Sequence, residues 1–225
     1  TVLDLTRVLA GPYCTMMLAD YGANVIKIEM PGKGDDTRAM GPKKNDYSMY
    51  YAYVNRGKKG ITLNLKSEEG KKLFLEMVKK ADVVVENYRP GVMDKLGVGY
   101  DVLKEVNDQI IYAAVSGFGC YGPKHQRPGY DIIAQATSGL MSITGEAGGQ
   151  PLRVGNAMGD VLGGMVASFL AQGLDALDAA TLAVSVHGRA GRAAARELSV
   201  HAVMPEDIIC KIGSVLLDLE AEDNS

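Results

Sequence analysis

Short runs of β-branched and apolar residues alternate, along the first half of the chain, with segments whose apolar positions recur every three or four residues. The runs predict buried strands, and the longer segments predict helices with recognisable ends. Ser67, for example, precedes Glu68 and the apolar positions Leu73 and Met77, which is the pattern of a capped amphipathic helix. The predicted strands are residues 2–5, 24–29, 61–65, 82–86 and 110–115.

The alternation of strands and helices predicts an α/β fold, because strands joined by helices pair in parallel and are covered on both faces. We expect a mostly parallel, Rossmann-like sheet. The pattern changes near residue 160, since residues 161–222 are rich in alanine and almost wholly helical in pattern. We therefore predict an α/β domain over residues 1–158 and an all-helical C-terminal segment over residues 159–225.

Helix ends are marked within this C-terminal segment. Asp175 follows a glycine and a leucine and is predicted to cap one helix, and Pro205 is predicted to open the last one. The apolar spacing of the first of these helices assigns its buried face to Leu177, Ala180, Val184 and His187.

Two glycine- and proline-rich segments interrupt the repeating pattern. Residues 31–45 form a predicted surface loop, and residues 117–129 form a second loop directly after a predicted strand. Asp131 then begins a predicted helix that runs to Leu140, and its simplest role is the N-cap of that helix. Parallel sheets bind ligands at the carboxyl ends of their strands, so the second loop is the expected place for a site.

Composition and charge narrow the class of protein only a little. The 225 residues are 47% hydrophobic and 23% charged, with a net charge of −3, which gives no electrostatic case for a nucleic-acid partner. No apolar run reaches the roughly 20 residues that span a bilayer, so we expect no membrane partner. The three cysteines (Cys14, Cys120 and Cys210) are widely spaced, which indicates no metal site and favours a cytoplasmic protein.

The pair Gly159-Asp160 carries the clearest signal for chemistry. It precedes an apolar helical run, so Asp160 is expected in the first turn of a helix, where unpaired N–H groups favour an anion or a reacting group nearby. The alternative is a plain helix N-cap, a role worth about 1 kcal/mol for aspartate. The local sequence leaves both open.

Six segments between residue 2 and about residue 166 resemble the class III CoA-transferase family, which includes formyl-CoA transferases and, more distantly, α-methylacyl-CoA racemases. So many segments in the family's order are far more specific than one short motif. They are residues 3–12, 22–29, 55–59, 84–91, 116–119 and 127–131.

The resemblance implies that Asp160 is a nucleophile. Its carboxylate would attack an acyl-CoA thioester, form a mixed anhydride and release the CoA thiolate. The thiolate would then attack the anhydride and leave an enzyme thioester, which the incoming carboxylic acid exchanges. The implied ligands are coenzyme A, as an acyl-CoA substrate, and a carboxylic acid, without a metal.

The resemblance also implies a groove for CoA. Lys95 stands where the family often has an arginine, so a point charge replaces a bidentate fork. Tyr130 would orient the substrate; racemases have a histidine in this context, and a phenol is a poor second base, which favours a transferase. The implied groove residues are Val8, Leu9, Ala10, Leu63, Lys66, Asn87, Tyr88, Arg89 and Lys95.

The C-terminal part departs from that family. From about residue 155 it resembles the end of ADP-dependent NAD(P)H-hydrate dehydratases, in which an aspartate at the place of Asp160 is a base, so the chain looks chimeric. The matching segments are residues 159–164, 170–174 and 184–191. The second domain and glycine-rich loop of class III CoA-transferases are not in this chain, so their interlocked dimer cannot close here, but a homodimer is expected.

Three functions follow from these observations. The leading one is a CoA-transferase that moves CoA between carboxylic acids through Asp160. The second is a non-catalytic α/β module that binds CoA or folds without a ligand. The third is an ADP- or ATP-dependent dehydratase, for which the nucleotide-binding part of the fold is missing.

Overall fold

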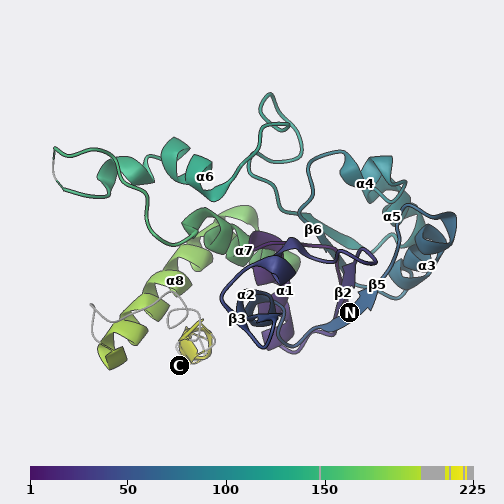
Figure 1. Cartoon of the computed structure of the whole chain (residues 1–225), viewed down its shortest axis with the longest axis horizontal. Coiled ribbons are helices and arrows are strands. Elements are labelled where there is room, and N and C mark those ends of the chain that lie inside the picture. Colours follow the sequence, from purple (N-terminus) through teal and green to yellow (C-terminus); the bar gives the residue numbers. More distant parts are fainter. Residues whose placement is uncertain (147, 199–210, 213, 220, 222–225) are drawn as a thin grey trace.

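A five-stranded parallel sheet forms the centre of the molecule, in the strand order β5-β2-β1-β6-β7 (Figure 1). The computed structural model describes residues 1–146, 148–198, 211–212, 214–219 and 221. A strand is present at or near each predicted position, and the predicted α/β fold is confirmed. The prediction of a buried strand over residues 61–65 is wrong in part, because β5 lies at the sheet edge, begins at Lys59 and is exposed along its length. The strands are β1 (Val2–Asp4), β2 (Val25–Glu29), β5 (Lys59–Thr62), β6 (Val83–Glu86) and β7 (Ile111–Ala114).

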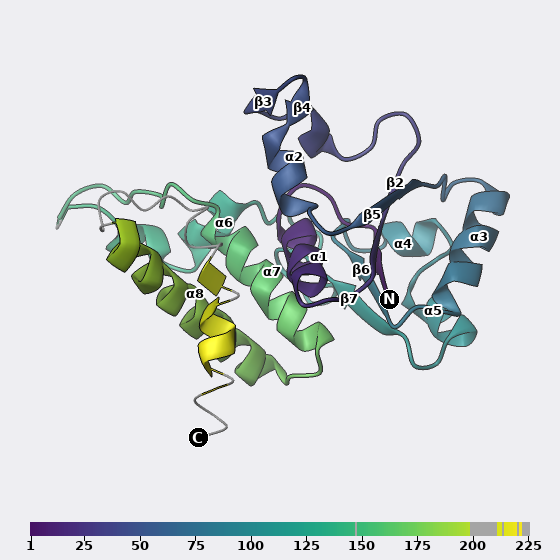
Figure 2. The same ribbon diagram turned by 90° about the horizontal axis from the view of Figure 1, so that it is seen from below.

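Helices cover both faces of the sheet (Figure 2). On one face, α3 (Glu68–Val78), α4 (Val92–Lys95) and α5 (Tyr100–Val106) pack against apolar side chains such as Leu3 and Val84. On the other face, α1 (Ala10–Asp20) and α7 (Met158–Ala171) pack against Val2 and Val85. The alternation of Val84 and Val85 between the two faces is the period-two geometry of a strand.

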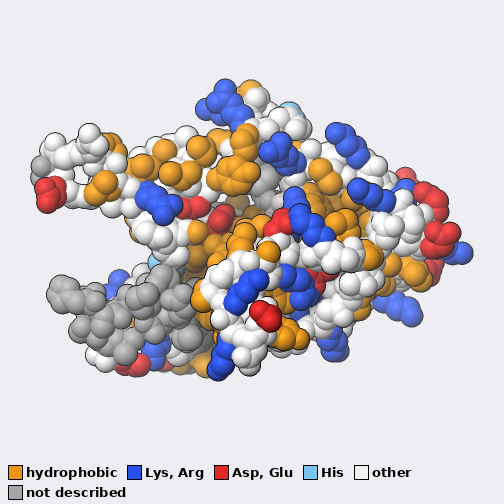
Figure 3. Space-filling view, viewed as in Figure 1, with side chains coloured by type: hydrophobic (Ala, Val, Ile, Leu, Met, Phe, Trp, Pro, Cys, Tyr) orange, Lys and Arg blue, Asp and Glu red, His pale blue; other side chains and the backbone are white. Residues whose placement is uncertain are grey.

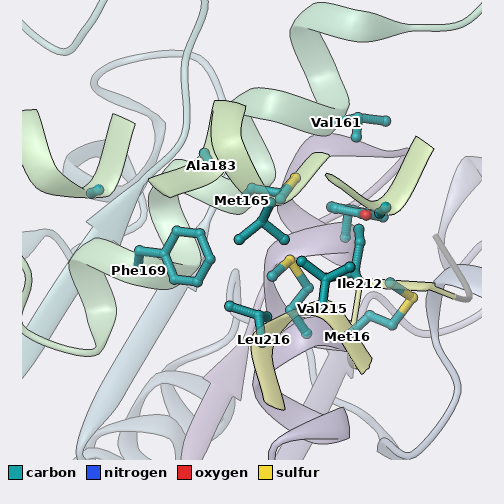
Figure 4. Packing of buried hydrophobic residues seen from close by; sticks show 13 residues of the cluster. Met16, Val161, Met165, Phe169, Ala183, Ile212, Val215 and Leu216 are labelled. Atoms are coloured by element: carbon teal, nitrogen blue, oxygen red, sulfur yellow. The ribbon is translucent and has the colours of Figure 1, made fainter. Parts of the chain in front are cut away.

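The helical C-terminal part continues this second layer. The helix α8 (Ala176–Leu198) packs on the side of α7 that faces away from the sheet (Figure 2). One apolar cluster joins Met16 of α1 with Met165 and Phe169 of α7, Ala183 of α8 and Leu216 near the C-terminus (Figure 4). The core therefore runs without a break from the sheet-covering helix α1 to the C-terminal helices.

Two predicted helix caps are confirmed. The Ser67 hydroxyl accepts a hydrogen bond from the Gly70 N–H at 3.1 Å, at the start of α3. The Asp175 carboxylate accepts from the N–H groups of Leu177 and Asp178 at 2.9 and 3.0 Å, at the start of α8. Such caps satisfy donors that the first helical turn leaves unpaired.

The predicted N-cap role of Asp131 is wrong. The helix α6 (Asp131–Thr137) has Tyr130 as its N-cap residue, and Asp131 is its first helical residue. This helix also ends earlier than predicted, and a separate 3-10 turn, η2 (Leu140–Ile143), follows after Gly139 takes a left-handed conformation.

The predicted buried face of α8 is also wrong. Leu177 and Val184 are 75% and 62% exposed. The buried stripe is displaced around the helix because small side chains, rather than large ones, let α8 approach α7 closely; it consists of Ala179, Ala183, Val186 and Ala190. The predicted helix start at Pro205 lies outside the described residues.

The segment predicted as a surface loop contains regular structure. It holds the 3-10 turn η1 (Asp36–Ala39) and β3 (Lys43–Lys44), which pairs with β4 (Tyr47–Ser48) in a hairpin followed by α2 (Met49–Val54). Strands of two residues are too short to show alternation of apolar and polar positions, so the sequence pattern could not reveal them.

Candidate functional site

A cleft of about 490 Å³ opens at the carboxyl ends of β1, β6 and β7. Residues 7–10, 87–90 and 115–117, which directly follow these three strands, form one side of it. Residues 125–131 and the first turn of α7 form the other side. This is the edge at which parallel α/β sheets place their ligands, and the glycine-rich loop expected there lies on the cleft.

The cleft brings together eight of the eleven site residues expected from the sequence. Leu63, Lys66 and Lys95 lie outside it: Leu63 packs against the apolar cluster under α3, and Lys66 and Lys95 are exposed. Only a ligand that extends beyond the cleft could reach these three. The eight lining residues are Val8, Leu9, Ala10, Asn87, Tyr88, Arg89, Tyr130 and Asp160.

Asp160 is the third residue of α7, and the N-cap position belongs to Ala157. The interpretation of Asp160 as a plain N-cap is therefore wrong. Its side chain is half-buried on the cleft wall. Burial, followed by the nearby Asp131 carboxylate, raises its pKa to about 6. A carboxylate of this kind is ionised at neutral pH but weakly stabilised, which suits a nucleophile.

Asp131 caps α7 across space instead of capping its own helix. Its Oδ1 atom accepts a hydrogen bond from the Gly159 N–H at 2.8 Å, and its Oδ2 atom accepts one from Gln135 at 2.7 Å. The Gly159 N–H is one of the unpaired donors in the first turn of α7. Asp131 thus fixes the backbone directly before Asp160 and also places a negative charge near it.

Gln135 holds the segment that leads into α7. The side chain is 1% exposed. Its Nε2 atom donates to the Asn156 carbonyl at 3.1 Å, and its Oε1 atom accepts from the Val154 N–H at 2.8 Å. This role could not be predicted from the sequence, because the partners of Gln135 lie 19 and 21 residues away along the chain.

Three arginines line the cleft. They are Arg7, Arg89 and Arg127, and sequence reasoning had singled out only Arg89 among them. Arg7 stands over the Tyr88 ring, with its guanidinium carbon 5.5 Å from the ring centroid, and lies 3.6 Å from the Asp36 carboxylate, which also lines the cleft. Arginine side chains on a cleft favour an anionic ligand.

Two further polar groups near Asp160 were not anticipated. Burial and the negative charge of Asp160 raise the pKa of Tyr50 to about 12, which places this phenol within electrostatic range of the carboxylate. The hydroxyl of Ser116 lines the cleft and is buried without a hydrogen-bond partner among the described residues. A ligand oxygen or nitrogen could satisfy it.

The described residues show neither a metal-binding cluster nor a membrane-spanning helix. Within those residues there is no group of three or more His, Cys, Asp or Glu side chains placed to hold a metal ion. The helices described there are too short or too polar to cross a bilayer.

Comparison with known proteins shows that residues 1–190 are similar to CoA-transferases. The profile of CoA-transferase family III matches residues 1–190. The chain is 54% identical over 165 residues to an acetyl-CoA:oxalate CoA-transferase of Acetobacter aceti, covering 73% of this chain and 42% of that protein. It is 51% identical over 167 residues to human succinyl-CoA:glutarate CoA-transferase, covering 74% and 38%.

The fold matches as well. The crystal structure of a CAIB/BAIF family protein from Brucella suis superposes with a TM-score of 0.72 at 39% identity, over 84% of this chain and 49% of that one. The chain thus spans less than half of each of these three proteins. The matched residues include the sheet, the cleft and Asp160, and the chain belongs to CoA-transferase family III.

Proposed function

We propose that the chain binds an acyl-CoA in the cleft and transfers CoA between carboxylic acids, with Asp160 as the nucleophile. The observation that carries this proposal is the half-buried carboxylate with a pKa near 6, which faces a cleft rimmed by arginines. The names of the relatives, which are CoA-transferases for oxalate and for glutarate, support the reaction class.

In the proposed reaction the Asp160 carboxylate attacks the thioester carbonyl, and the carbon–sulfur bond breaks to give a mixed anhydride and the CoA thiolate. The thiolate attacks the aspartyl carbonyl of the anhydride, releases the first acid as its carboxylate and leaves an aspartyl-CoA thioester. The second carboxylate attacks this thioester, and the thiolate that leaves attacks the new anhydride at the acyl carbon, so Asp160 is regenerated.

The residues on each side of the cleft have distinct proposed roles. The backbone of residues 8–10 and the side chains of Asn87, Tyr88 and Arg89 receive the CoA, and Tyr130, which is 69% exposed, orients the substrate. Leu63, Lys66 and Lys95 contact the distant end of the CoA, since they lie outside the cleft.

Thermal stability measured with CoA and with ADP in parallel tests CoA binding. We expect CoA to raise the melting temperature and Arg89→Ala to weaken this shift, because a ligand that binds only the native state stabilises it. Arg192→Ala is the matched control, since Arg192 is an exposed arginine on α8, away from the cleft. A cooperative melt that ignores CoA would support the second candidate, a folded α/β module without this ligand.

Trapping with hydroxylamine tests the nucleophile. Incubation with an acyl-CoA should give a hydroxamate on the peptide that contains Asp160, and Asp160→Asn should abolish it. A chain that binds CoA but gives no adduct would be a non-catalytic CoA-binding module, and the proposed transfer would be wrong.

We also propose, on the sequence resemblance of its C-terminal part, that the chain is chimeric with an ADP-dependent dehydratase. The profile of CoA-transferase family III extends to residue 190 and so covers nearly all of residues 159–164, 170–174 and 184–191, and the proposal rests on the sequence resemblance alone. Thermal stabilisation by ADP or ATP, but not by CoA, would favour the dehydratase function.

We propose that the chain forms a homodimer. Apolar side chains lie along the arm that carries α6 and η2 (Figure 3), where Ile143 is 83% exposed, and α8 exposes Leu177 and Val184. Exposed apolar residues grouped in this way are typical of interaction surfaces. Sedimentation velocity should show a dimer that Val184→Lys or Ile143→Asp weakens.

A cytoplasmic location is proposed from the cysteines. Cys14 is a buried free thiol and Cys120 an exposed one. Free thiols persist in a reducing compartment. Thiol titration of protein isolated under alkylating conditions should find both residues reduced.

A further inference from the structure

Val8 holds an unusual backbone conformation on the cleft wall. Its φ angle is +69°, in the left-handed region that β-branched residues rarely adopt. Such strain persists only where the surroundings enforce it, and it gathers at ligand sites. Val8, Leu9 and Ala10 line the cleft where the chain enters α1, whose first residue is Ala10.

Two side chains hold the peptide groups that lead into this strained residue. Asn87 accepts from the Arg7 N–H at 2.8 Å and donates to the Arg7 carbonyl at 2.7 Å. The Val8 N–H donates to Oδ1 of Asp35 at 3.2 Å. The peptide that joins Arg7 to Val8 is therefore bound at both its carbonyl and its N–H.

Asp35 is itself held by an ion pair with a buried lysine. The Lys27 ammonium lies 2.9 Å from Oδ2 of Asp35, and both side chains are 1% exposed. The same ammonium donates to the Thr6 carbonyl at 2.7 Å. Thr37 donates its N–H and its hydroxyl to Oδ1 of Asp35, at 3.0 and 2.8 Å.

Stabilisation of the fold does not by itself explain the buried ion pair of Lys27 and Asp35. Removing two charges from water costs about as much as their attraction returns, so replacing a buried ion pair with apolar residues is often neutral. The strained Val8 adds a further cost. Asp35 also caps η1 by accepting from the Thr37 N–H, but that cap does not require a buried lysine. A buried charge pair that fixes a strained peptide on a ligand cleft is better explained by the shape that it imposes.

We propose that Lys27 and Asp35 are positioning residues, which hold Val8 in its left-handed conformation and thereby set the cleft wall formed by residues 8–10. Both lie beneath that wall, so they act through the backbone and not by touching the ligand. The identity of the ligand as CoA rests on the proposed function; the positioning itself does not.

Four variants in a Lys27→Met background isolate the effect of the Asp35 acceptor on the conformation of Val8. Asp35→Asn keeps an oxygen acceptor for the Val8 N–H without leaving a buried charge, and Asp35→Leu removes the acceptor. Each is made with and without Val8→Gly, because glycine adopts a positive φ without strain. If Lys27→Met/Asp35→Leu does not fold, Lys27→Met/Asp35→Ala replaces it. The four form a double-mutant cycle, which separates coupling through Val8 from general loss of stability.

The first measurement is hydrogen exchange at the Arg7 N–H. This N–H donates to Asn87 and not to Asp35, so a change at Asp35 does not remove its acceptor. Asp35→Leu should speed this exchange about tenfold relative to Asp35→Asn, because a tenfold change corresponds to about the strain energy of one residue in the left-handed region. Val8→Gly should largely remove the difference, because glycine carries no such strain. Equal exchange in the Asp35→Asn and Asp35→Leu forms, or a difference that Val8→Gly leaves unchanged, would overturn the positioning role.

The second measurement is the Kd of CoA by calorimetry on the same proteins. We expect Asp35→Leu to weaken CoA binding about tenfold relative to Asp35→Asn, and the loss to shrink in the Val8→Gly background. If the unaltered chain binds no CoA, the proposed function fails and the Arg7 exchange alone decides the positioning role. If it binds CoA and all four variants bind equally, the positioning role is wrong and the proposed function stands.

Discussion

At the scale of single residues, the Asp131 carboxylate affects both the position and the pKa of the Asp160 carboxylate. Asp131 binds the Gly159 N–H and so fixes the turn that presents Asp160, while its charge disfavours ionisation of Asp160. The family resemblance singled out Asp160 from the sequence. The role of Asp131 was beyond sequence reasoning, because its partner Gly159 is 28 residues away and local rules describe only caps within one helix.

The raised pKa of Asp160 predicts how stability depends on pH. The folded state favours the protonated form, so the stability that this group contributes is present below about pH 4 and is lost as the pH rises through about 6. Asp160→Asn mimics the protonated form. It should leave the melting temperature nearly unchanged at pH 4 and raise it by roughly 6 °C or more at pH 7.5. Asp108→Asn, at an exposed position, should change neither value, and an equal gain at both pH values would contradict the assignment.

Substitution of Asp131 separates its charge from its hydrogen bond. Asp131→Asn keeps an acceptor for the Gly159 N–H but removes the charge, so the pKa of Asp160 should fall and the pH at which adduct formation declines should move downward. Asp131→Ala also loses the cap and should lower the free energy of unfolding by about 1 kcal/mol. Chemical denaturation and the pH profile of hydroxylamine trapping measure the two effects; an unmoved profile in Asp131→Asn would exclude the electrostatic role.

At the scale of helices and strands, sequence patterns worked where one face was plainly apolar. The strands were found because they are short runs of β-branched and apolar residues, and the helix after Ser67 because its apolar positions recur every three or four residues. The buried face of α8 was missed because alanines, not Leu177 or Val184, make its contact with α7. Local patterns anticipated the cleft only as a loop at the end of β7, because its walls come from segments far apart in the sequence; the family resemblance supplied eight of its lining residues.

The contact between α1 and α7 predicts opposite effects at two adjacent glycines. A Cβ atom on Gly164 would lie 2.6 Å from the Ala10 carbonyl oxygen, whereas one on Gly163 would meet nothing within 4 Å. Gly164→Ala should therefore lower the free energy of unfolding by about 1–3 kcal/mol, since α7 must move away from α1. Gly163→Ala should raise it by up to about 1 kcal/mol through helix propensity. Denaturant titration of both variants measures this, and similar values for the two would show that the helices are not in close contact.

At the scale of the whole molecule, the boundary predicted between residues 158 and 159 stays a prediction. The apolar cluster that includes Met16, Met17, Val161 and Met165 spans that boundary. Removing residues 159–225 would expose the α1 side of the cluster, at about 1.5–3 kcal/mol for each large side chain, against a typical total stability of 5–15 kcal/mol.

A chain ending at residue 158 should thus lose its cooperative melt and bind a hydrophobic dye, because α1 would lack its cover. Circular dichroism at rising temperature and dye fluorescence, compared with the whole chain, measure this. A shortened chain that melts cooperatively near the temperature of the whole chain would support an independent domain over residues 1–158.

The loop between β7 and α6 is closed at its base by two glycines. A Cβ atom on Gly117 would lie 2.3 Å from the Gly129 Cα atom, so the backbones touch where the loop leaves and rejoins the fold. Residues 118–128 can therefore be lengthened, shortened or exchanged without shifting Tyr130 or Asp131, which follow the closure. In evolutionary terms, this loop can change in length and sequence while the backbone that carries Asp131 is inherited unchanged.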